Sequence, residues 1–131
     1  MNQWLGRFSD LIYGAMRFMV GALFACHGAQ KLFGVLGGQG PVSSPLLLAA
    51  GIIELVGGCL VAFGLQAGWA AFIASGTMAV AYFKAHAPGG FWPVVNGGEL
   101  AVLYCFVFLY IAARGSGRYS LDVLLKTKGK R

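Results

Sequence analysis

The chain has 131 residues, of which 58% are hydrophobic and 11% are charged, and its mean hydropathy is +0.73. A soluble domain carries about a quarter charged residues, so this composition excludes an ordinary soluble protein and indicates one membrane domain over residues 1–131. The net charge of +6 comes mostly from the last eighteen residues. Anionic lipid headgroups account for such a basic segment, and the aromatic residues, which lie in apolar runs, offer no platform for nucleic acid.

The first predicted span covers residues 11–32, close to the ~20 residues that cross a bilayer. Gly14, Gly21 and Gly28 recur every seven residues, so they share one helix face on which a second helix can approach closely. Arg17 lies on the same face. The glycine-rich loop that follows lacks the Gly-Lys-Ser/Thr ending of a nucleotide-binding loop.

The second predicted span covers residues 45–65. It begins with a serine cap at Ser44 and a proline in the first turn. Glu54 lies near its middle, and Gly51 and Gly58 place this carboxylate on a close-packing face.

A polar, glycine-rich hairpin joins the third predicted span, residues 67–87, to the fourth, residues 94–113. Four spans put both termini on one side, and the basic tail over 114–131 makes that side cytoplasmic. The sequence thus predicts an all-α, integral membrane four-helix bundle.

Ionised side chains at bilayer depth cost at least about 2.5–3.5 kcal/mol, so each needs a partner or water. At a rise of ~1.5 Å per residue, Glu54 lies near the midplane and Arg17 lies about 5 Å toward the cytoplasm. These depths predict an ion pair between the two. If it exists, exchanging the charges (Arg17→Glu with Glu54→Arg) rescues assembly. A purely structural role for the pair stays open beside a catalytic one.

A second polar layer is predicted nearer the outer face, where it would line a cavity that opens outward together with the inner pair. Its members are His27, Gln30, Lys31, Lys84, His86, Asn96 and Glu99. Tyr82 and Trp92 flank it, and beside them a flat quinone ring is the one organic ligand considered. No metal is predicted, because the spacing of H-E-x-x-H is missing. The alternatives are a His27 that bonds a helix carbonyl and a Trp92 that anchors the interface.

Cys26, Cys59 and Cys105 each lie in an apolar run, and no C-x-x-C occurs. We therefore expect buried, inert thiols and no disulfide framework.

Several motifs in a fixed order resemble the DoxX family of small bacterial inner-membrane proteins, from about Arg17 to Asp122. They are His27-Gly28-x-x-Lys31-Leu32-Phe33-Gly34, Gly51-x-x-Glu54-x-x-Gly57-Gly58, Ala79-x-Ala81-Tyr82-Phe83-x-x-His86, Trp92-Pro93-x-x-Asn96-Gly97-Gly98-Glu99, Gly115-x-Gly117 and Ser120-Leu121-Asp122. The resemblance implies a four-helix, multi-pass protein of the bacterial inner membrane. Relatives called DoxD are linked to thiosulfate:quinone oxidoreduction, and DoxX proteins to a membrane-associated complex that handles thiol and superoxide stress.

The resemblance therefore implies a subunit of a membrane redox or thiol-stress system, which would act as an oxidoreductase only with a partner. Two non-enzymatic alternatives stay open: a carrier of small molecules, and a scaffold that holds partner proteins or further copies of the chain. No dinucleotide fingerprint, phosphate loop or hydrolase elbow occurs, which argues against an independent enzyme with its own cofactor.

Overall fold

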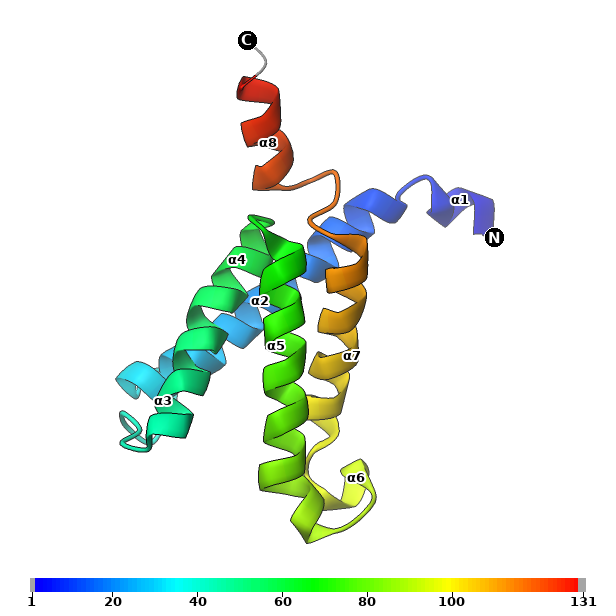
Figure 1. Cartoon of the computed structure of the whole chain (residues 1–131). Helices are drawn as coiled ribbons and strands as arrows, with labels where there is room; N and C mark the ends of the chain where they lie inside the picture. Colours follow the sequence, from blue (N-terminus) through cyan, green and yellow to red (C-terminus); the bar gives the residue numbers. More distant parts are fainter. Residues whose placement is uncertain (1, 130–131) are drawn as a thin grey trace.

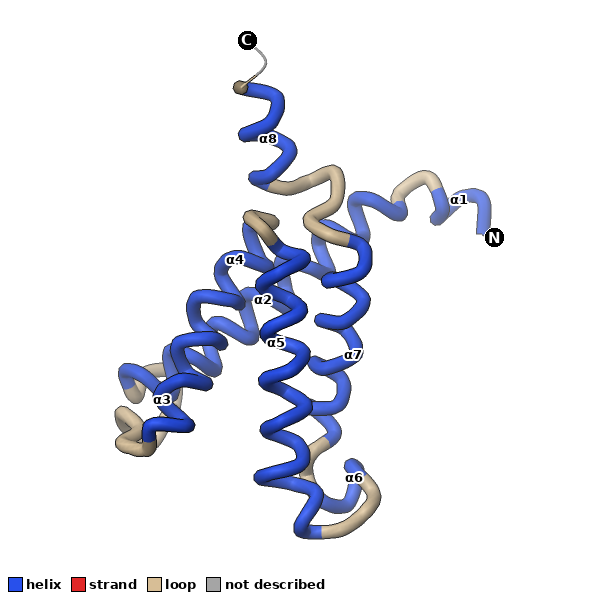
Figure 2. The backbone as a smooth tube through the Cα atoms, viewed as in Figure 1, coloured by secondary structure: helices blue, strands red, loops and turns tan. Residues whose placement is uncertain are grey.

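The computed structural model describes residues 2–129, and within them the chain is helical, without a β-strand (Figures 1 and 2). The elements, in chain order, are α1 (Asn2–Gly6), α2 (Ser9–Phe33), α3 (Pro45–Ile52), η1 (Ile53–Gly57), α4 (Gly58–Phe63), α5 (Ala67–Ala81), η2 (Tyr82–His86), η3 (Ala87–Gly89), α6 (Pro93–Asn96), α7 (Glu99–Arg114) and α8 (Leu121–Lys128). Both η1 and η2 are single turns of π-helix that continue their neighbours without a break.

Two helical segments, Ser9–Phe33 and Pro45–Phe63, are long and apolar enough to cross a membrane. They coincide with the first two predicted spans. The third predicted span corresponds to α5 with η2, and the fourth to α7; that these two also cross a bilayer stays a prediction. The fourth span was expected to begin at residue 94, but α7 begins at Glu99, because Gly97 adopts a left-handed backbone (φ 75°) and ends the short α6.

The helices pack in two pairs. In Figure 1, α5 and α7 run side by side, while α2 packs against the continuous segment α3–η1–α4. The start of α5 contacts α4 near the end that carries α1 and α8. Toward the opposite end, the two pairs diverge in Figure 1. The two ends of the molecule therefore differ in how tightly the pairs approach each other.

Glycines set the spacing between α2 and α3–α4. A Cβ placed on Gly21 would lie 2.4 Å from the backbone nitrogen of Ala62, and one on Gly28 would lie 2.3 Å from that of Leu55. Gly58 meets the backbone of α2 in the same way, with Gly21 O at 2.6 Å from a Cβ built there. The prediction of a close-packing glycine face is confirmed for Gly21 and Gly28. Gly14 differs, because it faces the side chain of Tyr119 from the C-terminal segment.

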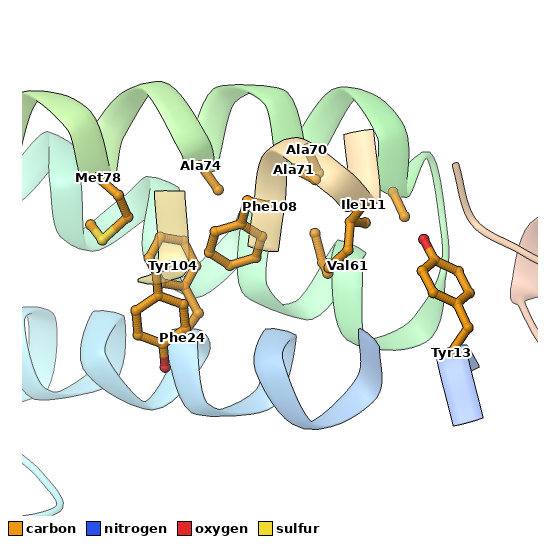
Figure 3. Packing of buried hydrophobic residues seen from close by; sticks show 11 residues of the cluster. Tyr13, Phe24, Val61, Ala70, Ala71, Ala74, Met78, Tyr104, Phe108 and Ile111 are labelled. Carbon is orange, nitrogen blue, oxygen red and sulfur yellow. The ribbon is translucent and has the colours of Figure 1, made fainter. Parts of the chain in front are cut away.

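An aromatic and alanine core joins the two pairs (Figure 3). The ring of Phe24 on α2 lies 4.6 Å from that of Phe108 on α7, measured between centroids, and Phe108 in turn stacks on Tyr104 at 5.6 Å. To the same cluster α5 contributes a face of small side chains: Ala67, Ala70, Ala71 and Ala74. Small residues there allow the aromatic rings of the neighbouring helices to fill the centre of the molecule.

The predicted serine cap of α3 forms only in part. Ser44 occupies the cap position and Pro45 the first turn, but the Ser44 side chain makes no capping hydrogen bond.

Candidate functional site

Glu54 is the buried carboxylate of the molecule's described part, with only 2% of its surface exposed. It lies in the π-helical turn η1, where the extra residue in the turn rotates the backbone relative to a regular α-helix. Lys31 on α2 donates hydrogen bonds to both carboxylate oxygens, one of them at 2.6 Å between Nζ and Oε2. An ion pair thus joins α2 to the middle of α3–η1–α4.

The prediction that Arg17 pairs with Glu54 is wrong. The glycine contacts set Gly28 against Gly51 and Leu55, so Glu54 lies level with Gly28. Arg17 is eleven residues away along α2, about 16 Å at ~1.5 Å per residue, whereas Lys31 is less than one turn from Gly28. Since a lysine side chain spans one helical turn easily, Lys31 is the cation that reaches the carboxylate.

A polar cavity of about 270 Å³ lies between the diverging pairs and contains this ion pair in its wall. Its lining residues come from α2, η1, α5, η2, the turn between α6 and α7, and α7 itself. They are Phe24, His27, Lys31, Glu54, Met78, Ala81, His86, Gly97, Leu100, Ala101 and Tyr104. The ring of His27 meets that of Tyr104 edge to face, with centroids 6.2 Å apart. Two imidazoles, an ion pair and a phenol therefore share one small space.

The hairpin between α5 and α7 holds His86 in place. Asn96 donates hydrogen bonds to the Tyr82 hydroxyl at 3.2 Å and to the Gly90 carbonyl at 2.9 Å, and it accepts one from the Gly98 amide at 2.8 Å. Gly98 lies so close to η2 that an added Cβ would stand 2.8 Å from Cβ of His86. Asn96 and Tyr82 thus fasten the hairpin to the π turn that carries the imidazole, without lining the cavity themselves.

An apolar groove of about 510 Å³ adjoins the cavity on the side of α3 and α5. Its lining residues are Lys31, Leu46, Leu47, Ala49, Ala50, Ile53, Glu54, Gly76, Thr77, Val80, Ala81, Lys84 and Ala85. Lys31, Glu54 and Ala81 belong to both spaces. The ion pair is consequently the boundary between a polar cavity and a long apolar groove.

Three predicted site residues lie elsewhere at this end. Gln30 donates a hydrogen bond to the Leu36 carbonyl at 2.9 Å and so holds the loop after α2. Glu99 is exposed at the first residue of α7 and does not line the cavity. Trp92 is 67% exposed and packs edge to face on Phe91, 5.1 Å between centroids.

Arg17 lies at the opposite end, between the end of α4 and the segment that leads into α8. Its guanidinium donates to the carbonyls of Val61 and Ala62 (2.7 Å for Ala62) and to that of Tyr119 at 2.6 Å. Carbonyls at the end of a helix carry partial negative charge, so Arg17 stabilises the C-terminus of α4. These contacts place Arg17 outside the polar cavity. The sequence had predicted it inside the cavity, paired with Glu54.

The cysteines and the candidate metal ligands give no further centre. The predicted burial of the thiols is wrong for Cys26 and Cys59, which are exposed on the outer faces of α2 and α4, while Cys105 is half-buried. Between residues 2 and 129, no three side chains of His, Cys, Asp or Glu lie close enough together to hold a metal ion.

Comparisons with known proteins identify the family. The DoxX family model matches residues 14–87, more than half of the chain. The chain belongs to the DoxX family. A Haemophilus influenzae protein described as uncharacterized is 42% identical over 125 residues, which cover 90% of this chain and 93% of that protein. A second uncharacterized protein of the same organism is 32% identical over 73 residues, 56% of this chain and 48% of its own length. No solved structure matches.

The region matched by the DoxX model includes the four ionisable residues His27, Lys31, Glu54 and His86 of the cavity lining. Tyr104 lies beyond it, and sequence reasoning missed this residue. In an apolar run a tyrosine looks like any core aromatic, and only the crossing of α7 over α2 brings its ring beside His27. For this member of the DoxX family, the cavity is therefore built partly from the shared region and partly from the C-terminal helix.

Proposed function

We propose that this DoxX protein is a four-span, multi-pass subunit of a redox or thiol-stress system in the bacterial inner membrane, and that it binds a quinone. One observation carries the proposal: the Lys31–Glu54 pair separates a cavity that contains two histidines from an apolar groove. A quinone has the same division, with a polar ring at one end and a hydrocarbon tail at the other. The composition and the two membrane-length helices support the bilayer setting.

The dimensions of the two spaces suit such a ligand. The ring would enter the cavity of about 270 Å³, where His27 and His86 offer N–H donors for its two carbonyl oxygens and Tyr104 offers an aromatic face. The tail would follow the groove of about 510 Å³ between α3 and α5, which faces the lipid. Reduction of a quinone takes two electrons, from a partner protein, and two protons, which imidazoles at the ring oxygens can deliver.

The core between the two ends favours binding over transport. Phe24, Tyr104 and Phe108 fill the space above the cavity with stacked aromatic rings, and the alanine face of α5 closes against them. A polar solute would have to pass this apolar layer, which lacks hydrogen-bonding partners. This arrangement supports a ligand site at one end of the molecule more than a path across it.

Binding of ubiquinone-1 to the full chain in lipid nanodiscs, followed by quenching of tryptophan fluorescence, tests the proposal. Replacing His27 by alanine removes one ring donor and should weaken binding about tenfold, since a hydrogen bond contributes ~1–1.5 kcal/mol. Cys26→Ala, one residue earlier on the lipid-facing side, is the matched control and should change binding less than twofold. Equal affinities for the two variants would contradict the proposal. Solute uptake into liposomes by the purified chain would instead establish a carrier. A partner protein that co-purifies with a chain that binds no quinone would establish a scaffold.

A further inference from the structure

The end of the molecule opposite the polar cavity holds a buried cation that forms no ion pair with a described carboxylate. Arg17 is 2% exposed, and its partners are three backbone carbonyls. Its Nε–H is buried and has no acceptor within residues 2–129. Asp122, one of two carboxylates at this end, accepts hydrogen bonds from the Ser116 hydroxyl at 2.5 Å and the Gln66 amide at 3.0 Å. It forms no ion pair with Arg17, although its charge acts on the guanidinium at longer range.

Neutral carbonyls satisfy hydrogen bonds but do not cancel a full charge. Moving an ion out of water costs several kcal/mol, and a nearby opposite charge is what offsets that cost. In the described part of the chain, the carboxylates that form ion pairs are Glu54 and Asp10, and their partners are Lys31 and Arg114. Asp122 therefore compensates the charge of Arg17 only from beyond ion-pair distance, and the remainder is open to an anion from outside the protein.

A cavity of about 530 Å³ lies directly beside Arg17. It opens between the start of α2, the end of α4 and α8, and its lining residues are Leu11, Gly14, Ala15, Arg17, Phe18, Ala62, Phe63, Arg118, Tyr119, Ser120, Leu121 and Leu124. Two features stand out: its walls are mainly apolar, and its two charged residues, Arg17 and Arg118, are both cationic. Arg118 is exposed, so it stands at the rim, whereas Arg17 is in the wall.

We propose that this cavity is a binding site for one acidic phospholipid, with its phosphate at Arg118 and Arg17 and an acyl chain along Phe18 and Phe63. The occupant must be both anionic and apolar, because the lining combines two guanidiniums with a hydrocarbon surface. A soluble phosphate matches only the first property, and a neutral lipid only the second. The amphipathic α8 adds Lys126 and Lys128 on the same end, where they attract anionic headgroups without lining the cavity.

Native mass spectrometry of the full chain, released from micelles that contain phosphatidylglycerol, tests the site. Arg118→Ala should reduce the retained phosphatidylglycerol about fivefold, the effect of one cation near a headgroup, and Arg118→Lys should restore part of it. Lys128→Ala removes the same charge outside the cavity and should reduce retention less than twofold. Arg118 is exposed, so these variants keep the buried contacts of Arg17.

A second pair of variants tests the apolar wall at constant charge. Ala15→Phe fills the cavity and should lower phosphatidylglycerol retention, whereas Ala113→Phe, on an exposed face of α7, should leave it unchanged. Equal losses of phosphatidylglycerol retention for Arg118→Ala and Lys128→Ala would show that the basic residues attract the lipid without a specific site. Displacement of the lipid by glycerol phosphate at equal concentration would assign the site to a soluble anion, and retention of phosphatidylcholine at the same level would remove the role of charge. Each of these results overturns the proposal.

Discussion

Replacing Lys31 in the Lys31–Glu54 pair should lower the free energy of unfolding more than replacing Glu54. Lys31→Met leaves the carboxylate of Glu54, which is 2% exposed, without a partner. Removal of one member of a buried pair costs about 3–5 kcal/mol when the other charge stays buried. The side chain of Lys31, by contrast, is 30% exposed, so after Glu54→Gln its ammonium can turn toward water, and we expect a loss of about 1–2 kcal/mol.

The double variant Lys31→Met with Glu54→Gln removes both charges and should be more stable than the sum of the single losses predicts. For groups in direct contact, coupling energies of about 2 kcal/mol are expected. Equilibrium unfolding with sodium dodecyl sulfate in mixed micelles, monitored by circular dichroism, measures each free energy. Lys84→Met is the matched control, because this exposed lysine lines the same apolar groove as Lys31. This substitution should change the free energy of unfolding by no more than ~0.5 kcal/mol.

Strict additivity of the two single losses would refute this account of the ion pair. So would a larger loss for Glu54→Gln than for Lys31→Met, since the argument rests on the difference in exposure between the two side chains. Exchanging the charges of Arg17 and Glu54 should not restore stability, because Arg17 contacts the end of α4 whereas Glu54 contacts Lys31 near the other end of α2.

Two further changes test the packing and the hairpin. Gly28→Ala places a methyl group 2.3 Å from a backbone nitrogen of the facing helix and should destabilise the fold by about 2–3 kcal/mol in the same unfolding assay, whereas Gly76→Ala, with no atom within 4 Å, should be neutral or stabilising. Asn96→Ala removes three hydrogen bonds and should speed amide hydrogen exchange in residues 87–98 about tenfold or more, while Gln39→Ala, an exposed amide of the other loop, should leave that exchange unchanged; the reverse order would contradict the fastening role.

The close packing of α2 on α3–α4 could be predicted from sequence because it depends on one local property. A glycine has no Cβ, and glycines spaced by seven residues fall on one helix face whatever surrounds them. Gly21, Gly28 and Gly58 accordingly meet backbone atoms of the facing helix. The register itself came from the structure: Gly28 lies against Gly51 and Leu55, and from that level Lys31 reaches Glu54.

The partner of Glu54 was predicted wrongly because depth in a bilayer is a poor measure of contact. Two side chains at similar computed depth meet only if their helices touch in the right register, and a cation has other acceptors to choose from. For Arg17 these acceptors are the carbonyls at the end of α4, which no ion-pair argument considers. Counting charges and pairing them by sign therefore overlooked the helix terminus as a competing partner.

Glu99 shows a second limit, in which a single backbone conformation decides where a side chain points. A carboxylate at the start of α7 and at the depth of His27 was expected to face the cavity. Gly97 and Gly98 separate α6 from α7, and Gly98 turns toward η2, where it packs against Tyr82 and His86. The next residue, Glu99, then faces outward. The rotation of a helix after such a break follows from its contacts, which the sequence pattern does not contain.

The contacts of Arg17 and Lys31, the two cations of α2, explain why a ring bound in the polar cavity would move only one end of the molecule. At the end near the termini, Arg17 bonds three carbonyls from two separate segments, and Asp122 ties the start of α5 to the chain after α7, so several side-chain hydrogen bonds hold the helix ends there. At the other end, one ion pair joins α2 to η1, and η1 and η2 are π turns, a form of helix that is often found at functional sites. Local opening starts where few tertiary contacts must break. We therefore expect a ring that enters between His27 and His86 to shift η2 and the hairpin, while the Arg17 end stays fixed.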